Sequence, residues 1–242
     1  MGRNAYFNFK TFGLQFSKKV FPVGTDSSLL GAWMCKYAST QNKKINVLDI
    51  GCGTGILSLF AAKTLNASVT AIDIQEAAVE QCLENVKLNH EEKNVTVSLS
   101  DIATYSGPTN FYDVIVSNPP YFSDIKEVKT EREIARQTGQ HFDLNTLILK
   151  TTSLLNSNGK MYLVVPFDQK QQYLISAIAN KLHLSQIAFV KGTKQSEIKR
   201  TLLCFSKAES NYIKEEIIIV ENDRKQYTTK AKSLLSPFYL NL

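Results

Sequence analysis

The chain has 242 residues, of which 43% are hydrophobic and 21% are charged. This length and composition predict an ordinary globular protein with room for one α/β domain. No apolar run approaches the roughly 18 residues that a membrane span needs, and the first residues lack the apolar stretch of a secretory signal. The four cysteines and three histidines are scattered without metal-ligand spacing, which argues against a zinc site or a disulfide framework. We therefore expect a cytoplasmic protein with no bound metal.

The charge is unevenly distributed. The chain has 28 Lys and Arg residues against 22 Asp and Glu residues, and residues 1–44 alone hold seven basic side chains and one acidic side chain. The same segment contains aromatic side chains between the basic ones, among them Tyr6, Phe7, Phe9, Phe12 and Phe16. A basic segment with interleaved aromatic residues favours a nucleic acid partner, which carries phosphates and stackable bases. The alternative is an arm whose aromatic side chains pack against the domain.

Hydrophobic patterning predicts alternating helices and strands along the chain. Helices are expected at 23–37, 55–65, 75–89, 143–155 and 169–182, and strands at 45–50, 69–74, 95–99, 112–116, 160–166, 184–190 and 201–205. Residues 217–220 are a further candidate for an edge strand. Strands that are apolar on both faces and alternate with helices predict a parallel sheet, whereas the last two strands have no helix between them and predict an antiparallel hairpin.

The expected fold is therefore α/β, with a mostly parallel, seven-stranded sheet, a C-terminal antiparallel hairpin and helices on both faces. Residues 1–44 are interpreted as a basic and aromatic extension with one helix. Residues 45–242 are interpreted as the main body of a single domain, because no linker rich in Pro or Gly interrupts them.

A glycine-rich turn follows the first predicted strand. Gly51, Gly53 and Gly55 come directly after it, and glycine allows positive φ and close approach of the backbone to a ligand. Their spacing differs from the dinucleotide fingerprint Gly-x-Gly-x-x-Gly, and the preceding Asp49 would repel a pyrophosphate. A carboxylate at this position suits a ligand with a cationic amino group, such as S-adenosylmethionine.

Two further acids follow the next two predicted strands. Asp73 can accept hydrogen bonds from both ribose hydroxyls, and Asp101 from an adenine amino group. Each acid alone could simply cap a helix, but three acids at consecutive strand ends favour a ligand site, because ligands of open α/β sheets bind there. The predicted cofactor-binding residues are Asp49, Gly51, Gly53, Gly55, Asp73, Ile74, Asp101, Ile102 and Asn118.

The fourth predicted strand ends in Asn118-Pro119-Pro120-Tyr121, the predicted catalytic segment. The Asn118 side-chain oxygen and the Pro119 carbonyl can accept the two N–H bonds of a planar amine and aim its nitrogen at a methyl donor. The prolines stiffen the loop by fixing φ, and Tyr121 offers a ring for stacking. A simple Pro-Pro turn is the alternative, but the upstream glycine turn favours methyl transfer to a planar nitrogen.

These motifs resemble those of class I S-adenosylmethionine-dependent amino-methyltransferases. The chain is further similar to the bacterial valine-tRNA adenine-N6 methyltransferases, through residues 9–12, 23–26, 29–33, 117–121, 132–136 and 238–240. The resemblance implies a Rossmann-like fold and methylation of adenine 37, next to the anticodon. It implies tRNA as the partner. From the sequence itself we expect no membrane association, and no obligate protein partner is evident. The resemblance also implies RNA contacts by Lys18, Lys19, Arg132 and Arg136, although the two arginines could instead pair with neighbouring glutamates.

Two other methyltransferase classes remain open alternatives. Protein N5-glutamine methyltransferases of the release-factor type act on an amide nitrogen, but they carry a helical substrate domain before the glycine turn, where this chain has only 44 residues. Ribosomal RNA purine amino-methyltransferases usually have a duplicated domain, which this chain lacks. A non-catalytic RNA-binding relative would be expected to have lost Asp49, Gly51 or Asn118.

Overall fold

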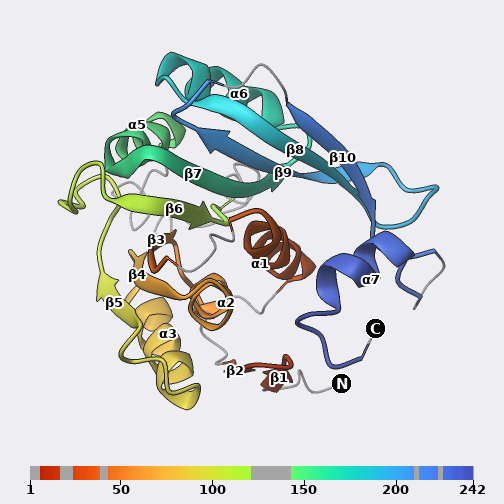
Figure 1. Cartoon of the computed structure of the whole chain (residues 1–242), viewed down its shortest axis with the longest axis horizontal. Coiled ribbons are helices and arrows are strands. Elements are labelled where there is room, and N and C mark those ends of the chain that lie inside the picture. The colour runs from red at the N-terminus through yellow and green to blue at the C-terminus, as the bar shows by residue number, and fades with distance from the viewer. Residues whose placement is uncertain are drawn as a thin grey trace, which may run out of the picture.

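The computed structural model describes residues 6–16, 24–38, 43–120, 143–209, 213–222 and 226–241 (Figure 1). The described helices are α1 (Thr25–Ala38), α2 (Ile56–Thr64), α3 (Glu76–Leu88), α5 (Leu144–Leu154), α6 (Lys170–Ala179) and α7 (Thr229–Leu235). The described strands are β1 (Tyr6–Asn8), β2 (Gly13–Gln15), β3 (Ile45–Ile50), β4 (Ala67–Asp73), β5 (Val95–Leu99), β6 (Tyr112–Ser117), β7 (Leu155–Pro166), β8 (His183–Lys191), β9 (Ile198–Ser206) and β10 (Lys214–Ile219). None of these helices combines the length and apolar character that a membrane crossing requires.

The main sheet has the strand order β10-β8-β9-β7-β6-β3-β4-β5, and only its pairings with β9 are antiparallel. This confirms the mostly parallel α/β fold and the C-terminal antiparallel pair. The predicted count of seven strands is wrong, because β10 pairs with β8 and makes an eighth. Its first half, Lys214-Glu215-Glu216, is polar, so the strand lacks the continuous apolar run that marks the central strands. The short helix α7 also escaped prediction.

Successive residues of the central strands enter two separate cores. On β3, Val47 faces one core and Leu48 the other, and Val116 and Ile115 divide in the same way on β6. One core contains side chains from α1, α2, α3 and α7, and the other contains side chains from α5 and α6. This arrangement explains the uninterrupted apolar strands, because both faces of the sheet are covered (Figure 1).

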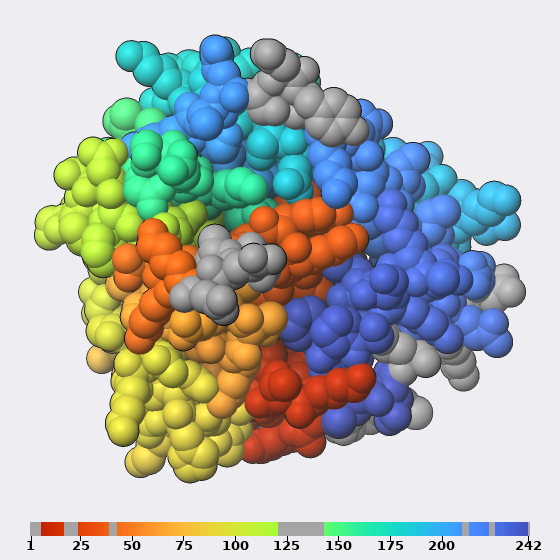
Figure 2. Space-filling model, viewed as in Figure 1, coloured from red at the N-terminus to blue at the C-terminus, as the bar shows by residue number. Residues whose placement is uncertain are grey.

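The N-terminal hairpin of β1 and β2 packs against the body of the protein. Phe9 and Phe12 are buried, and each ring contacts the Phe60 ring of α2 at a centroid distance of 5.3 Å. The Lys10 amide donates to the Phe238 carbonyl (2.6 Å), which joins the hairpin to the C-terminal segment. Figure 2 shows the red N-terminal residues lying flush between yellow and blue parts of the surface.

The interpretation of this aromatic segment as a base-stacking surface is therefore wrong for Phe9 and Phe12, whose rings belong to the core. Hydrophobic burial at this position outweighs any exposed role, because the rings pack against Phe60 of α2. Tyr6 and Phe7 remain exposed. The boundary expected after residue 44 stays a prediction.

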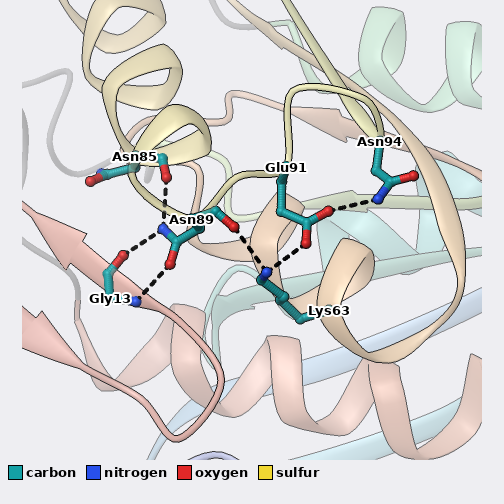
Figure 3. A network of polar contacts seen from close by, with 6 residues as sticks. All are labelled: Gly13, Lys63, Asn85, Asn89, Glu91 and Asn94. Atoms are coloured by element: carbon teal, nitrogen blue, oxygen red, sulfur yellow. Dashed lines mark hydrogen bonds and ion pairs between the residues drawn. The ribbon is translucent and has the colours of Figure 1, made fainter.

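A polar network fastens the hairpin to α3 and α2 (Figure 3). Asn89 accepts a hydrogen bond from the Gly13 amide (2.9 Å) and donates to the Gly13 carbonyl (2.8 Å). Lys63 of α2 donates to the Asn89 carbonyl (2.9 Å) and pairs with Glu91 (2.6 Å). The hairpin is thus held by side chains more than 70 residues away in the sequence.

Candidate active site

Three loops meet where β4, β3 and β6 end. Ile50, the last residue of β3, lies in register with Ile72 on β4 and with Ser117 on β6. The Ser117 hydroxyl donates to the Ile50 carbonyl (2.7 Å), which locks two of these strand ends together. The residues that follow this row are Gly51, Asp73 and Asn118. The structure therefore brings the predicted glycine turn, the ribose-binding acid and the predicted catalytic loop to one edge of the sheet.

The glycine turn has the conformation that the sequence predicts. Gly51, Gly53 and Gly55 have φ angles of 72°, 53° and 79°, in the left-handed region that favours glycine. A Cβ atom on Gly51 or Gly53 would meet nothing within 4 Å, whereas one on Gly55 would lie 2.7 Å from the Cys82 sulfur. Gly55 is thus required by helix packing, and the first two glycines leave open space in front of the turn.

Asp73 is tied to the glycine turn. Its Oδ2 accepts a hydrogen bond from the Gly53 amide (3.0 Å), and its Oδ1 accepts one from the Gln75 amide (2.9 Å). A carboxylate has about four lone-pair sites. Asp73 therefore keeps the capacity to accept two hydroxyl groups while its orientation is fixed from both sides.

Asp49 is completely buried beneath the turn. The Ser58 hydroxyl donates to its Oδ2 (2.7 Å), and no hydrogen bond reaches its Oδ1. Burial raises the pKa of the carboxyl group to about 7, the Ser58 hydrogen bond opposes this shift, and the charge of Asp73 adds to it. A buried carboxylate with an unsatisfied oxygen is chemically suited to a cationic amino group, as the sequence analysis predicted; a direct contact stays a prediction.

The third predicted acid follows β5 at the same edge. Leu99 is in register with Asp73, so Asp101 lies two residues beyond the strand end. Its Oδ1 accepts a hydrogen bond from the Ala103 amide (2.8 Å), which is the local capping role considered as an alternative. Ile74 is exposed and Ile102 is partly buried, so both offer apolar surface beside the acids.

Asn118 is held by a residue that the sequence analysis missed. Its Nδ2 donates to the Ser27 hydroxyl (2.9 Å) on the first turn of α1, 91 residues earlier in the chain. This hydrogen bond fixes the rotation of the Asn118 side-chain amide, so that its Oδ1 points away from the Ser27 hydroxyl. Ser27 adjoins Asp26, which pairs with Arg200 of β9 (2.7 Å). The only sequence signal for Ser27 is its place next to the motif of residues 23–26.

Asn85 is a second missed residue. It is fully buried, and its Nδ2 donates both to the Gln15 carbonyl of the hairpin (3.1 Å) and to the Thr54 carbonyl of the glycine turn (2.9 Å). Its Oδ1 accepts from the Gln15 amide (2.8 Å). The N-terminal hairpin is thus joined to the glycine turn through one side chain.

Several predicted residues lie outside the described part of the chain: Tyr121, Lys18, Lys19, Arg132 and Arg136. Of the remaining catalytic segment, Pro119 is buried and Pro120 is exposed. Within the described ranges, no group of three or more His, Cys, Asp or Glu side chains is placed to hold a metal ion.

A cavity of about 600 Å³ lies elsewhere, between Tyr37, Lys43, Asp113 and Asn158. These residues precede or begin β3, β6 and β7, or end α1, so the cavity opens at the amino ends of the parallel strands. It lies at the edge opposite to Gly51, Asp73 and Asn118, and it is no part of the candidate active site.

Comparisons with known proteins agree with this arrangement. The family model described as "Methyltransferase small domain" matches residues 15–192. A Phocaeicola vulgatus protein named tRNA1(Val) (adenine(37)-N6)-methyltransferase is 38% identical over 240 residues, which cover 99% of each chain. A Flavobacterium johnsoniae protein of the same name is 34% identical and covers 98% of this chain and 100% of its own.

Among solved structures, a predicted O-methyltransferase from Agrobacterium tumefaciens superposes with a TM-score of 0.66 and 14% identity, covering 88% of this chain and 96% of its own. At that identity the likeness shows the fold alone, a Rossmann-like methyltransferase fold. The full-length matches are more specific, because they include both the N-terminal hairpin and the C-terminal segment. The chain therefore belongs to the methyltransferase small-domain family and, within it, to the family of the tRNA1(Val) (adenine(37)-N6)-methyltransferases.

Proposed function

We propose that this protein transfers a methyl group from S-adenosylmethionine to the exocyclic N6 of adenine 37 in a valine tRNA, in the cytoplasm. The observation that carries the proposal is the row of Gly51, Asp73 and Asn118 at neighbouring strand ends. It sets a turn suited to the methyl donor beside an amide suited to an exocyclic amine. Relatives that match the whole chain are named for this reaction.

The residues present fit S-adenosylmethionine. Open space lies in front of Gly51 and Gly53, where a Cβ atom would meet nothing. The buried Asp49 has an oxygen with no hydrogen bond and suits the amino group of the methionine end. Asp73 and Asp101 would hold the ribose and the adenine, between the apolar side chains of Ile74 and Ile102. When bound, the donor supplies an electrophilic methyl group on a sulfonium centre.

The acceptor loop must orient a weak nucleophile. The N6 lone pair of adenine is delocalised into the ring, so attack requires the nitrogen to be held in line with the methyl group. The Asn118 Oδ1 and the Pro119 carbonyl would accept the two N–H bonds and favour pyramidalisation as the new N–C bond forms. Ser27 holds the Asn118 amide in the rotation that this role requires. As the new N–C bond forms, the bond between sulfur and the methyl carbon breaks, and neutral S-adenosylhomocysteine is the leaving group. The methylated nitrogen then loses one proton to solvent, and no dedicated base is needed.

We expect adenine 37 to leave its stack, because an enzyme that acts on a base must take it out of the stack to reach the target atom. The basic excess of the chain favours a polyanionic substrate. Outside the described residues, Lys18, Lys19, Arg132 and Arg136 are proposed to contact the RNA backbone.

The experiment is methyl transfer to two transcripts of the valine tRNA, one with adenine and one with guanine at position 37. The products are digested and analysed as nucleosides. N6-methyladenosine should form only with the adenine transcript. Equal labelling of both transcripts would show that the methylated position is a different one.

A further inference from the structure

Two aromatic rings and a lysine form a compact surface feature that the proposed active site does not use. The Lys170 Nζ lies 4.7 Å from the centre of the Phe167 ring and 5.3 Å from the centre of the Phe189 ring. The two rings meet edge to face at 5.9 Å. Phe167 is 37% exposed, although a phenylalanine next to a buried strand would normally be covered. We refer to these three residues as the Phe167 platform.

The platform lies beside Asn118. Phe167 directly follows β7, the neighbour of β6, so it lies at the same edge of the sheet as the acceptor loop. Its amide donates to the Lys199 carbonyl (3.1 Å) at the start of β9. Arg200, which follows Lys199, forms an ion pair with Asp26. Ser27, which follows Asp26, accepts a hydrogen bond from the Asn118 side-chain amide. Three polar contacts, linked through adjacent residues, therefore connect Phe167 to the proposed catalytic amide.

The surroundings of the platform are cationic. Lys191 ends β8, Lys194 and Glu197 lie in the turn that follows, and Lys199 lies at the start of β9. Asp168 lies between Phe167 and Lys170. The segments that meet at the platform thus carry four lysines and two acids, together with an exposed aromatic ring. Phosphate groups and bases are the two chemical parts of a nucleic acid, and this combination matches both.

We propose that the Phe167 platform binds the anticodon arm of the tRNA next to the target nucleotide. Lys170 contacts a backbone phosphate, and the Phe167 ring packs against a neighbouring base or ribose. This inference rests on the proposed function, because it takes tRNA as the substrate. It adds a contact surface on the β7-β9-β8 side of the sheet, made of residues that the sequence analysis did not select.

The test measures binding of an unmodified valine tRNA transcript to the full chain and to the variants Phe167→Ala and Lys170→Ala, at several salt concentrations. Phe167→Ala should weaken binding about tenfold with an unchanged salt slope, because it removes one stacking contact. Lys170→Ala should weaken binding and lower the salt slope by about one, because it removes one phosphate contact. Phe167→Tyr should bind as the unchanged protein does.

Matched controls come from the opposite edge of the sheet. Phe111 is 42% exposed just before β6, and Lys93 is exposed just before β5. Phe111→Ala and Lys93→Ala should leave tRNA binding unchanged, and all variants should keep donor affinity and melting temperature. The proposal is overturned if the platform variants bind tRNA normally, or if the control variants weaken binding equally.

The same experiment separates the platform from the proposed function. Methyl transfer by the unchanged protein is measured in parallel. A protein that binds tRNA through the platform without methylating it would uphold the platform and refute the proposed reaction. A protein that methylates tRNA with normal rates and affinity in both platform variants would refute the platform alone.

Discussion

The two halves of the sheet differ in topology and in what they bring to the active edge. In the half formed by β5, β4, β3 and β6, every strand is parallel, and each strand end opens into a loop with a proposed chemical role. In the half formed by β7, β9, β8 and β10, the antiparallel β9 begins at the same edge and carries Lys199 and Arg200 there. We therefore propose that one half holds the reacting groups and the other holds the substrate.

Helix α1 connects the two halves. Its first turn contacts Asn118 of the parallel half through Ser27 and Arg200 of the other half through Asp26. If the division of roles is correct, substitutions in the parallel half should alter the methyl-transfer rate or donor binding. Substitutions in the other half should alter tRNA binding.

The largest effect is expected for Asn118→Ala. Loss of an acceptor that acts on the developing charge should lower kcat by about 10²–10³-fold, while donor affinity changes little. Single-turnover methyl transfer and donor binding by calorimetry measure the two quantities. Normal turnover in this variant would remove Asn118 from the reaction and break the assignment of chemistry to the parallel half.

Asp73→Ala should lower the affinity for the methyl donor instead of the rate of methyl transfer. Two hydrogen bonds from ribose hydroxyls to a carboxylate would be lost, so donor affinity should fall about 100-fold, with tRNA affinity unchanged. Because Asp73 also accepts from the Gly53 amide, Asp73→Asn serves as the milder variant. Unchanged donor affinity in both variants would exclude the ribose role.

Asp49→Asn tests the buried acid through pH. The pKa of about 7 in the folded protein lies above the ordinary aspartate value of 3.8, so the folded state binds the proton more tightly than the unfolded state. Stability contributed by the neutral form is therefore lost as the pH rises through about 7. In the donor-free protein, the asparagine variant should reduce the difference in unfolding free energy between pH 5 and pH 8 by about 2 kcal/mol. An unaltered pH dependence would show that Asp49 is not the titrating group.

Ser27→Ala should have the smallest effect of the series. Losing one hydrogen bond that orients the Asn118 amide should lower kcat about tenfold, with KM for tRNA and donor affinity unchanged. Ser27→Thr keeps the hydroxyl and should restore the rate. If kcat stays normal in Ser27→Ala, the link from α1 to the acceptor loop has no role in positioning.

The sequence predicted the parts of the site that depend on local pattern. Gly51, Asp73 and Asn118 each follow an apolar strand directly, and parallel strands bring their ends to one edge, so the site followed from strand order. Ser27 and Asn85 could not be found in this way. Their partners lie 91 and 70 residues away, and nothing in their local sequence specifies the contact.

The sequence alone could not decide that the aromatic side chains of Phe9 and Phe12 in the N-terminal hairpin are buried. Composition shows that Phe9 and Phe12 lie among basic residues, but only the fold shows that their rings cover Phe60. The edge strand β10 was underpredicted for a related reason, because an edge strand needs only one buried side and Lys214 and Glu215 are exposed. The burial of the two rings and the formation of β10 both depend on packing partners, and not on local propensity.

The most direct test of the central claim is a pair of parallel reactions with labelled S-adenosylmethionine. One contains the valine tRNA without its modification, and the other contains a peptide-release factor. We predict transfer to the tRNA, with all label recovered as N6-methyladenosine at position 37. Transfer to a glutamine of the release factor, with none to the tRNA, would preserve the donor site and contradict the proposed function.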